Sequence, residues 1–63
     1  MNVQNVKFTL FDTANFYAEM AERQLQIGNH DQMMEYTYKH EALLAVIETL
    51  GWGKEYQNKF NGL

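Results

Sequence analysis

The chain has 63 residues, 46% of them hydrophobic, with no cysteine and a formal net charge of −3 at pH 7. The lack of cysteine excludes disulfides and thiolate metal sites, and the hydrophobic share, with nine aromatic residues and four methionines, argues against intrinsic disorder. Five lysine and arginine residues are few for a protein that must neutralise nucleic-acid phosphates, so composition makes nucleic-acid binding unlikely.

The length allows one domain, residues 1–63, and leaves it short of buried surface. A chain of this size buries only about 60% of the surface that it exposes when unfolded. Natural proteins below about 70–80 residues usually gain stability from disulfides, a metal or a partner subunit. Because disulfides are excluded and no histidine and carboxylate residues converge at metal-binding spacing, we expect a homodimer without a metal or other cofactor.

Nothing in the sequence predicts a membrane span or an export signal. No apolar run approaches the roughly 18 residues of a membrane-spanning helix. The first residues, MNVQNVKFTLF, lack the charged-then-apolar layout of a secretion signal. We therefore expect a cytoplasmic protein that does not act at a membrane. Origin on a phage or another mobile element is a further expectation, since such elements often encode chains this short.

Residues 1–9 carry an ambiguous pattern. Val6, Phe8 and Leu10 alternate with polar residues, and this period of two is typical of a strand. A lone strand has nothing to pair with inside this chain. We therefore expect an extended arm, strand or coil, that lays Phe8 over the helices.

A first helix is predicted to begin at Thr9 or Asp12, both suitable N-caps, and to end near Ile27. Its apolar positions recur every three or four residues, as expected for a helix face that packs on a neighbour. This face consists of Leu10, Ala14, Tyr17, Ala21 and Leu25.

The connection after this helix has strong turn signals. Gly28 suits the position after a helix end, because glycine adopts a positive φ without a Cβ penalty. Asn29 is predicted to cap a second helix, with Gln32 at its third position. A connection of about two or three residues folds the helices back as an antiparallel hairpin.

The second helix is predicted over residues 29–50, where one apolar face repeats at alternating spacings of three and four. This seam is formed by Met33, Tyr36, His40, Leu43, Ile47 and Leu50, with Tyr36, Leu43, Ile47 and Leu50 expected in the core. Gly51 is predicted to end the helix and to bring Trp52 onto Ile47. A short third helix follows over residues 54–60 and folds over one end of the hairpin. Its apolar stripe is Trp52, Tyr56, Phe60 and Leu63.

Residues 28–39, GNHDQMMEYTYK, resemble the middle of a tetratricopeptide repeat, where a glycine turn leads into a second helix with an acidic–aromatic pair. Met33 and His40 stand where that family has alanine, and no second copy follows. The resemblance therefore implies a helix–turn–helix geometry and no inherited peptide-binding function.

His40 allows two interpretations because it lies in the apolar seam. It is either a pH-sensitive switch or ligand inside a bundle, or a neutral histidine that hydrogen-bonds a tyrosine or a backbone carbonyl. We favour the second. The sequence has no serine, no cysteine and no glycine-rich phosphate loop, so we predict that the protein is not an enzyme.

Three ion pairs are predicted from acid-first spacings of four residues, which leaves Lys7 and Lys54 unpaired. The pairs are Glu19–Arg23, Glu35–Lys39 and Glu55–Lys59. An alternative function, RNA or DNA binding by a hairpin like that of the plasmid regulator Rop, requires a dimer to bring Lys7, Lys54 and Lys59 of both copies together. A third and weaker alternative is an acidic mimic of nucleic acid.

The back of the second helix predicts a binding surface. Met34 and Tyr38 lie opposite the seam, where a simple hairpin leaves them in water, and both residue types are enriched at interfaces. The predicted partner-interface residues are Met34, Tyr38, Glu41 and Trp52. The predicted fold class is all-α, a helical hairpin that dimerises into a four-helix-type bundle. The predicted function is that of a non-catalytic protein–protein interaction module: a small regulator, inhibitor or assembly factor with an unknown protein partner.

Overall fold

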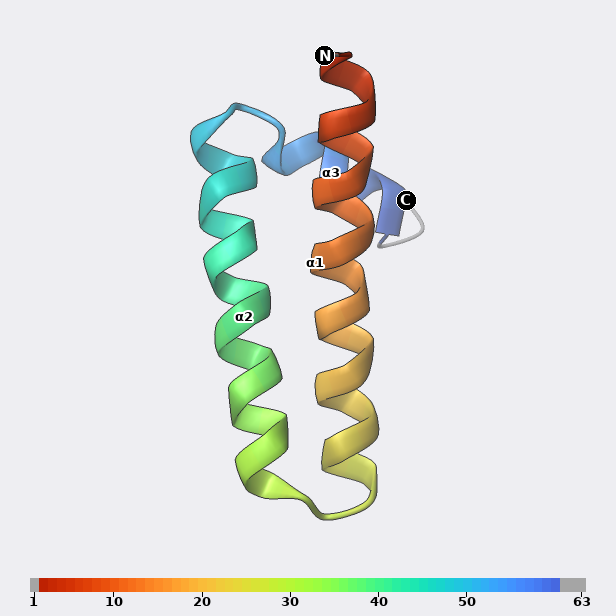
Figure 1. Cartoon of the computed structure of the whole chain (residues 1–63), viewed down its shortest axis with the longest axis vertical. Coiled ribbons are helices and arrows are strands. Elements are labelled where there is room, and N and C mark those ends of the chain that lie inside the picture. The colour runs from red at the N-terminus through yellow and green to blue at the C-terminus, as the bar shows by residue number, and fades with distance from the viewer. Residues whose placement is uncertain (1, 61–63) are drawn as a thin grey trace.

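The computed structural model describes residues 2–60, and within this range the chain is all-helical. It contains α1 (Val3–Gln26), α2 (His30–Thr49) and α3 (Gly53–Phe60). Figure 1 shows α1 and α2 side by side as an antiparallel pair, with α3 passing behind the N-terminal half of α1. The predicted hairpin with a short third helix is thus confirmed, whereas its pairing into a four-helix bundle stays a prediction.

The prediction of an extended N-terminal arm is wrong, because α1 already begins at Val3. The side chain of Asn2 caps this helix by accepting a hydrogen bond from the backbone N–H of Gln4 at 2.9 Å. Lys7, Phe11 and Ala14 then form the buried face at helical spacing. Because Lys7 is charged, the 4-and-3 spacing of this buried face does not appear as a run of apolar residues in the sequence.

The turn between α1 and α2 has the predicted chemistry. Gly28 has a φ of +78°, and its N–H donates to the carbonyl of Leu25 at 3.1 Å. The N–H of Asn29 reaches back to the carbonyl of Gln24 at 2.9 Å, which completes a Schellman ending. The side chain of Asn29 also accepts from the N–H of Gln32 at 3.3 Å, so one residue closes α1 and caps α2.

The end of α2 repeats this arrangement. Gly51 has a φ of +82° and donates to the carbonyl of Glu48, and the N–H of Trp52 donates to the carbonyl of Ile47, both at 2.9 Å. The Trp52 side chain packs on the core cluster that contains Ile47, as predicted. The remaining predicted residues of the third helix's stripe and its stop signal, residues 61–63, lie outside the described part of the chain.

The core lies at the end of the hairpin that α3 covers. Its buried apolar residues are Phe11, Ala14, Ile47 and Tyr56. Phe11 is central: its ring meets that of Tyr56 edge-on at 5.4 Å between centroids and that of Trp52 at 6.4 Å. One aromatic side chain from α1 therefore fixes α3 and the α2–α3 connection against the hairpin.

The predicted core residues of α2 are buried to different degrees. Ile47 is fully buried, Leu43 is half-buried against the core, and Tyr36 is half-buried farther along the helix. Leu50 is 50% exposed, so its assignment to the core is wrong. A strict 3-4 pattern drifts around a straight helix that has 3.6 residues per turn, and Leu50 caps the helix end, where the backbone turns away.

In residues 2–60, none of the helices combines the length and apolar character needed to cross a bilayer.

Candidate functional site

The structure brings three of the four predicted interface residues together and separates the fourth. Met34, Tyr38 and Glu41 follow one another on α2 at spacings of four and three, which places them on one side of the helix. Tyr38 and Glu41 are exposed and Met34 is half-buried. Trp52 lies at the other end of α2, partly buried against Phe11. It acts in the core, away from the other three.

The part of the hairpin farthest from α3 has no buried side chain. We call residues 17–38 the distal half; every one of them is half-buried or exposed. Figure 1 shows that, among residues 2–60, only α1 and α2 form this end of the hairpin. Two helices alone cannot enclose side chains, because each presents an apolar stripe wider than a single neighbour covers.

The length of α3 explains this gap in coverage. At about 1.5 Å per residue, its 8 residues span about 12 Å, whereas the 24 residues of α1 span about 36 Å. A third helix this short covers one end of the hairpin and leaves the other bare. Tyr17 and Leu25 were not predicted as interface residues because they belong to the face of the first helix that was expected to pack on the second. The predicted length of the third helix was the signal that this seam continues beyond its cover.

Apolar and aromatic side chains fill the distal half. Three of the chain's four methionines lie there, together with three of its four tyrosines and the exposed Leu25 and Ile27. These methionines and tyrosines are Met20, Met33, Met34, Tyr17, Tyr36 and Tyr38. Methionine adapts its flexible side chain to irregular surfaces, and tyrosine supplies broad contact area with a polar tip.

A stacked tyrosine pair joins the two helices inside the distal half. The rings of Tyr17 and Tyr36 lie 6.1 Å apart with an interplanar angle of 29°. The Lys39 ammonium lies 5.8 Å and 5.6 Å from the two ring centroids, and 3.3 Å from a carboxylate oxygen of Glu35. This confirms the predicted Glu35–Lys39 pair. It also places a pre-ordered aromatic surface at the edge of the apolar region.

The other two predicted ion pairs are wrong. Glu55 pairs with Lys7 of α1, with its carboxylate oxygens 2.9 Å and 3.1 Å from the Lys7 Nζ, so Lys59 does not take this partner. Glu19 accepts a hydrogen bond from the Asn15 amide at 3.2 Å. Lys7 is only 9% exposed, because α3 covers it. It was expected to be unpaired and is instead part of the contact between α1 and α3.

His40 has the hydrogen bond that its neutral interpretation predicted. Its Nδ1 lies 2.8 Å from the carbonyl oxygen of Ala14 on α1. A carbonyl only accepts, so Nδ1 carries the proton and donates. In a neutral imidazole the lone pair then resides on Nε2. The ring centroid of Tyr56 lies 6.4 Å away, and burial raises the pKa of this tyrosine above 10.0 by disfavouring the phenolate.

Comparisons with protein-family models, with curated proteins and with solved structures gave no match. The chemistry of the chain's own side chains therefore carries the functional inference.

Proposed function

We propose that this chain is a non-catalytic protein–protein interaction module whose distal half binds another protein surface, first of all that of a second copy. One observation carries this proposal: residues 17–38 contain many apolar and aromatic side chains, and none of them is buried. Large exposed apolar patches on small proteins mark interaction sites. Met34 and Tyr38 belong to this surface, Glu41 lies at its margin, and Trp52 lies outside it.

The residue types favour a protein partner over a nucleic acid. The distal half carries four carboxylates and one arginine; these are Glu19, Glu22, Asp31, Glu35 and Arg23. Nucleic-acid binding needs the opposite balance. Of the three lysines that a Rop-like dimer requires, Lys7 is already paired with Glu55. A role as a small regulator, inhibitor or assembly factor fits a chain that offers one adaptable surface.

Pairing of two hairpins would cover the distal half of each copy. Four helices enclose a core that two cannot, and antiparallel hairpins with short turns are the usual units of such bundles. Leu25 is 61% exposed, and covering it contributes about 1–2 kcal/mol in each copy, given about 1.5–3 kcal/mol for burying a whole leucine side chain. A dimer at micromolar concentration needs a net gain of about 8 kcal/mol, so several such residues must be covered to exceed the cost of association, about 4–15 kcal/mol.

Sedimentation equilibrium over a concentration series tests this proposal, with two variants matched in exposure and in kind. Leu25→Asp places a charge in the distal half. Val3→Asp places a charge at the start of α1, outside the distal half, at a residue that is 64% exposed. We expect the wild type and Val3→Asp to form dimers and Leu25→Asp to remain monomeric, with the same helical circular dichroism. Equal dimerisation of the two variants excludes the distal half as the interface, and a wild-type monomer at every concentration excludes self-association.

The response to salt separates a second copy from a different partner. Two distal halves bring like charges together, so added salt should screen the repulsion and strengthen the dimer. A basic partner protein, in contrast, is released by salt. Dimers that weaken as salt increases contradict pairing through two distal halves.

A further inference from the structure

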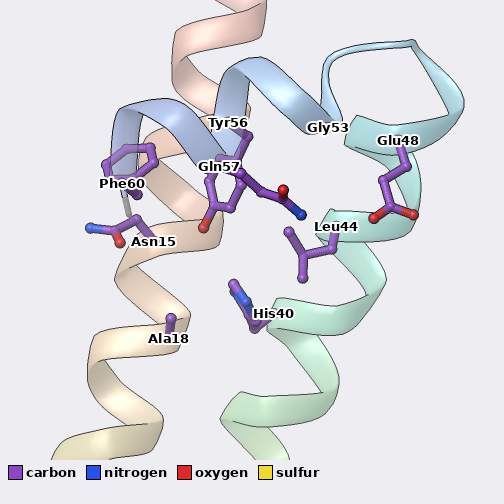
Figure 2. Close-up of a pocket in the computed structure, with 9 residues that line it drawn as sticks. All are labelled: Asn15, Ala18, His40, Leu44, Glu48, Gly53, Tyr56, Gln57 and Phe60. Carbon is purple, nitrogen blue, oxygen red and sulfur yellow. The ribbon is translucent and has the colours of Figure 1, made fainter. Parts of the chain in front are cut away.

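A cavity of about 240 Å³ lies where α1, α2 and α3 meet, on the side of the hairpin that α3 covers (Figure 2). Its wall includes Asn15 and Ala18 from α1, His40 and Leu44 from α2, and Tyr56 and Phe60 from α3. Figure 2 shows Tyr56 reaching from α3 into the space above His40. This cavity is separate from the predicted interface residues and has its own polar groups.

Tyr56 directs an unpaired hydroxyl group into this space. The residue is only 7% exposed, yet its hydroxyl has no hydrogen-bond partner among residues 2–60. Because the hydroxyl is not sealed off from solvent, the cavity is the place from which a partner can reach it.

His40 contributes the complementary acceptor. Its Nδ1–H donates to the Ala14 carbonyl oxygen at 2.8 Å. In the neutral ring, the lone pair on Nε2 is therefore the acceptor that a ligand can reach. The ring centroids of His40 and Tyr56 lie 6.4 Å apart, and no direct hydrogen bond joins the two side chains. A small group with several N–H donors, placed between them, can donate to both Nε2 and the phenolic oxygen.

The charge around the cavity selects the sign of the ligand. Among the described residues, no lysine or arginine lines it, whereas Glu48 does, and Figure 2 shows the carboxylate of Glu48 at the rim, beyond Leu44 as seen from His40. Glu48 lies close to the start of α3: a Cβ at Gly53 would come within 3.0 Å of its Cγ. The rings of Tyr56 and Phe60, 5.0 Å apart, add aromatic faces that attract cations, and the Lys59 ammonium already lies 5.5 Å from the Phe60 centroid. Among the described residues of the wall an anion meets no basic side chain, whereas an ammonium group meets two acceptors and π faces, with the carboxylate of Glu48 at the rim.

We propose that this cavity binds a small organic ammonium compound, a primary amine in its charged form attached to an apolar group about the size of one ring. An apolar cavity of about 150 Å³ holds benzene, so the volume found here leaves room for a ring and a short aminomethyl arm. The ring lies among Ala18, Leu44 and Phe60, and the ammonium group lies between His40 and Tyr56, with Glu48 at the rim of the cavity. This site shares only Ala18 with the distal half and uses different polar groups, so either proposal can fail without the other.

The test titrates the full-length protein at neutral pH with benzylammonium chloride, benzyl alcohol and sodium benzoate, followed by two-dimensional ¹H–¹⁵N NMR. The three probes share a ring and differ in charge. The variants are Tyr56→Phe, which keeps the core ring, and Glu48→Gln. Glu41→Gln is the matched control, since it removes the same charge from α2 outside the cavity wall.

We expect saturable shifts for benzylammonium in the millimolar range, centred on the amides of Asn15, Ala18 and Gln57, and at least fivefold weaker binding of the other two probes. Glu48→Gln should weaken binding about two- to fivefold, as for a partly exposed charge pair, and Tyr56→Phe about two- to tenfold. The control should change it less than twofold. Equal binding of benzyl alcohol, shifts confined to residues 19–38, no saturable shift at all, or equal effects of Glu48→Gln and Glu41→Gln each overturn the proposal.

Discussion

The contact between Lys7 and Glu55 offers the sharpest test of what holds α3 in place. Replacement of Glu55 by Gln keeps the side chain's size and removes its charge. The Lys7 ammonium, whose side chain is 11% exposed, then loses the carboxylate that lies 2.9 Å away. What remains near it is the face of Phe8 at 5.5 Å and that of Trp52 at 5.7 Å.

The expected cost lies between two known limits. Breaking a fully buried ion pair costs about 3–5 kcal/mol, and exposed pairs contribute about 0.2–1 kcal/mol. Lys7 is nearly buried, but the Glu55 side chain is 49% exposed, and water can partly replace its carboxylate. We therefore expect a loss of about 2 kcal/mol in the free energy of unfolding. For a chain of this size that lowers the Tm by about 8–16 °C, measured by far-UV circular dichroism at one fixed protein concentration.

A matched substitution elsewhere controls for the loss of a carboxylate. Glu35→Gln breaks the Glu35–Lys39 pair, in which both side chains are about half exposed. Its expected cost is about 0.5 kcal/mol or less. Lys7→Met, which replaces the charge by an apolar chain of similar length, should be close to neutral, because it leaves no buried charge unpaired. If Glu55→Gln costs no more than Glu35→Gln, burial by α3 does not strengthen the Lys7–Glu55 pair.

Three further predictions concern single residues. Because burial raises the pKa of Tyr56, the unfolded chain releases this proton at lower pH than the folded chain, and the free energy of unfolding should fall above about pH 10. Urea unfolding at about pH 9 and about pH 11 measures this fall, and Tyr56→Phe should reduce it. Gly28→Ala and Gly51→Ala should each cost about 1–2 kcal/mol, measured in urea, because both positions have positive φ and open space around an added Cβ; unequal costs would show that more than the backbone is involved. His40→Leu should cost about 1 kcal/mol in the same assay, since the Ala14 carbonyl keeps its helical partner; a much larger loss would mean that the imidazole has a further structural contact.

Local turn chemistry was the part of this fold that the sequence allowed us to predict best. A glycine that must take positive φ, followed by an asparagine with a capping side chain, determines the connection after α1 almost by itself. The same reasoning located the end of α2 at Gly51 and the packing of Trp52. These features depend on neighbours within a few residues, so no knowledge of tertiary contacts is needed to find them.

The errors came from contacts between residues far apart in the chain. Lys7 lies on the buried face of α1 because Glu55, 48 residues later, meets it there. A lysine in that position resembles a surface residue in the sequence. If Lys7 is taken as exposed, the residues around it alternate between polar and apolar, which is typical of a strand and not of a helix. The same long-range contact removed Glu55 from its predicted partner Lys59, whose Nζ instead lies 4.6 Å from the centroid of Phe8.

The uneven core connects the two proposals physically. Where Phe11, Ile47 and Tyr56 pack closely, side chains are held in fixed positions, and a small polar cavity such as the one beside His40 can keep its shape. In residues 17–38 the flexible methionines have no third helix to pack against, so that surface can adapt to a partner at little cost. A longer third helix would cover the distal half and remove the apolar surface that a partner needs. Under both proposals, the shortness of α3 therefore leaves one chain with a closely packed end for a small ligand and an uncovered end for a protein partner.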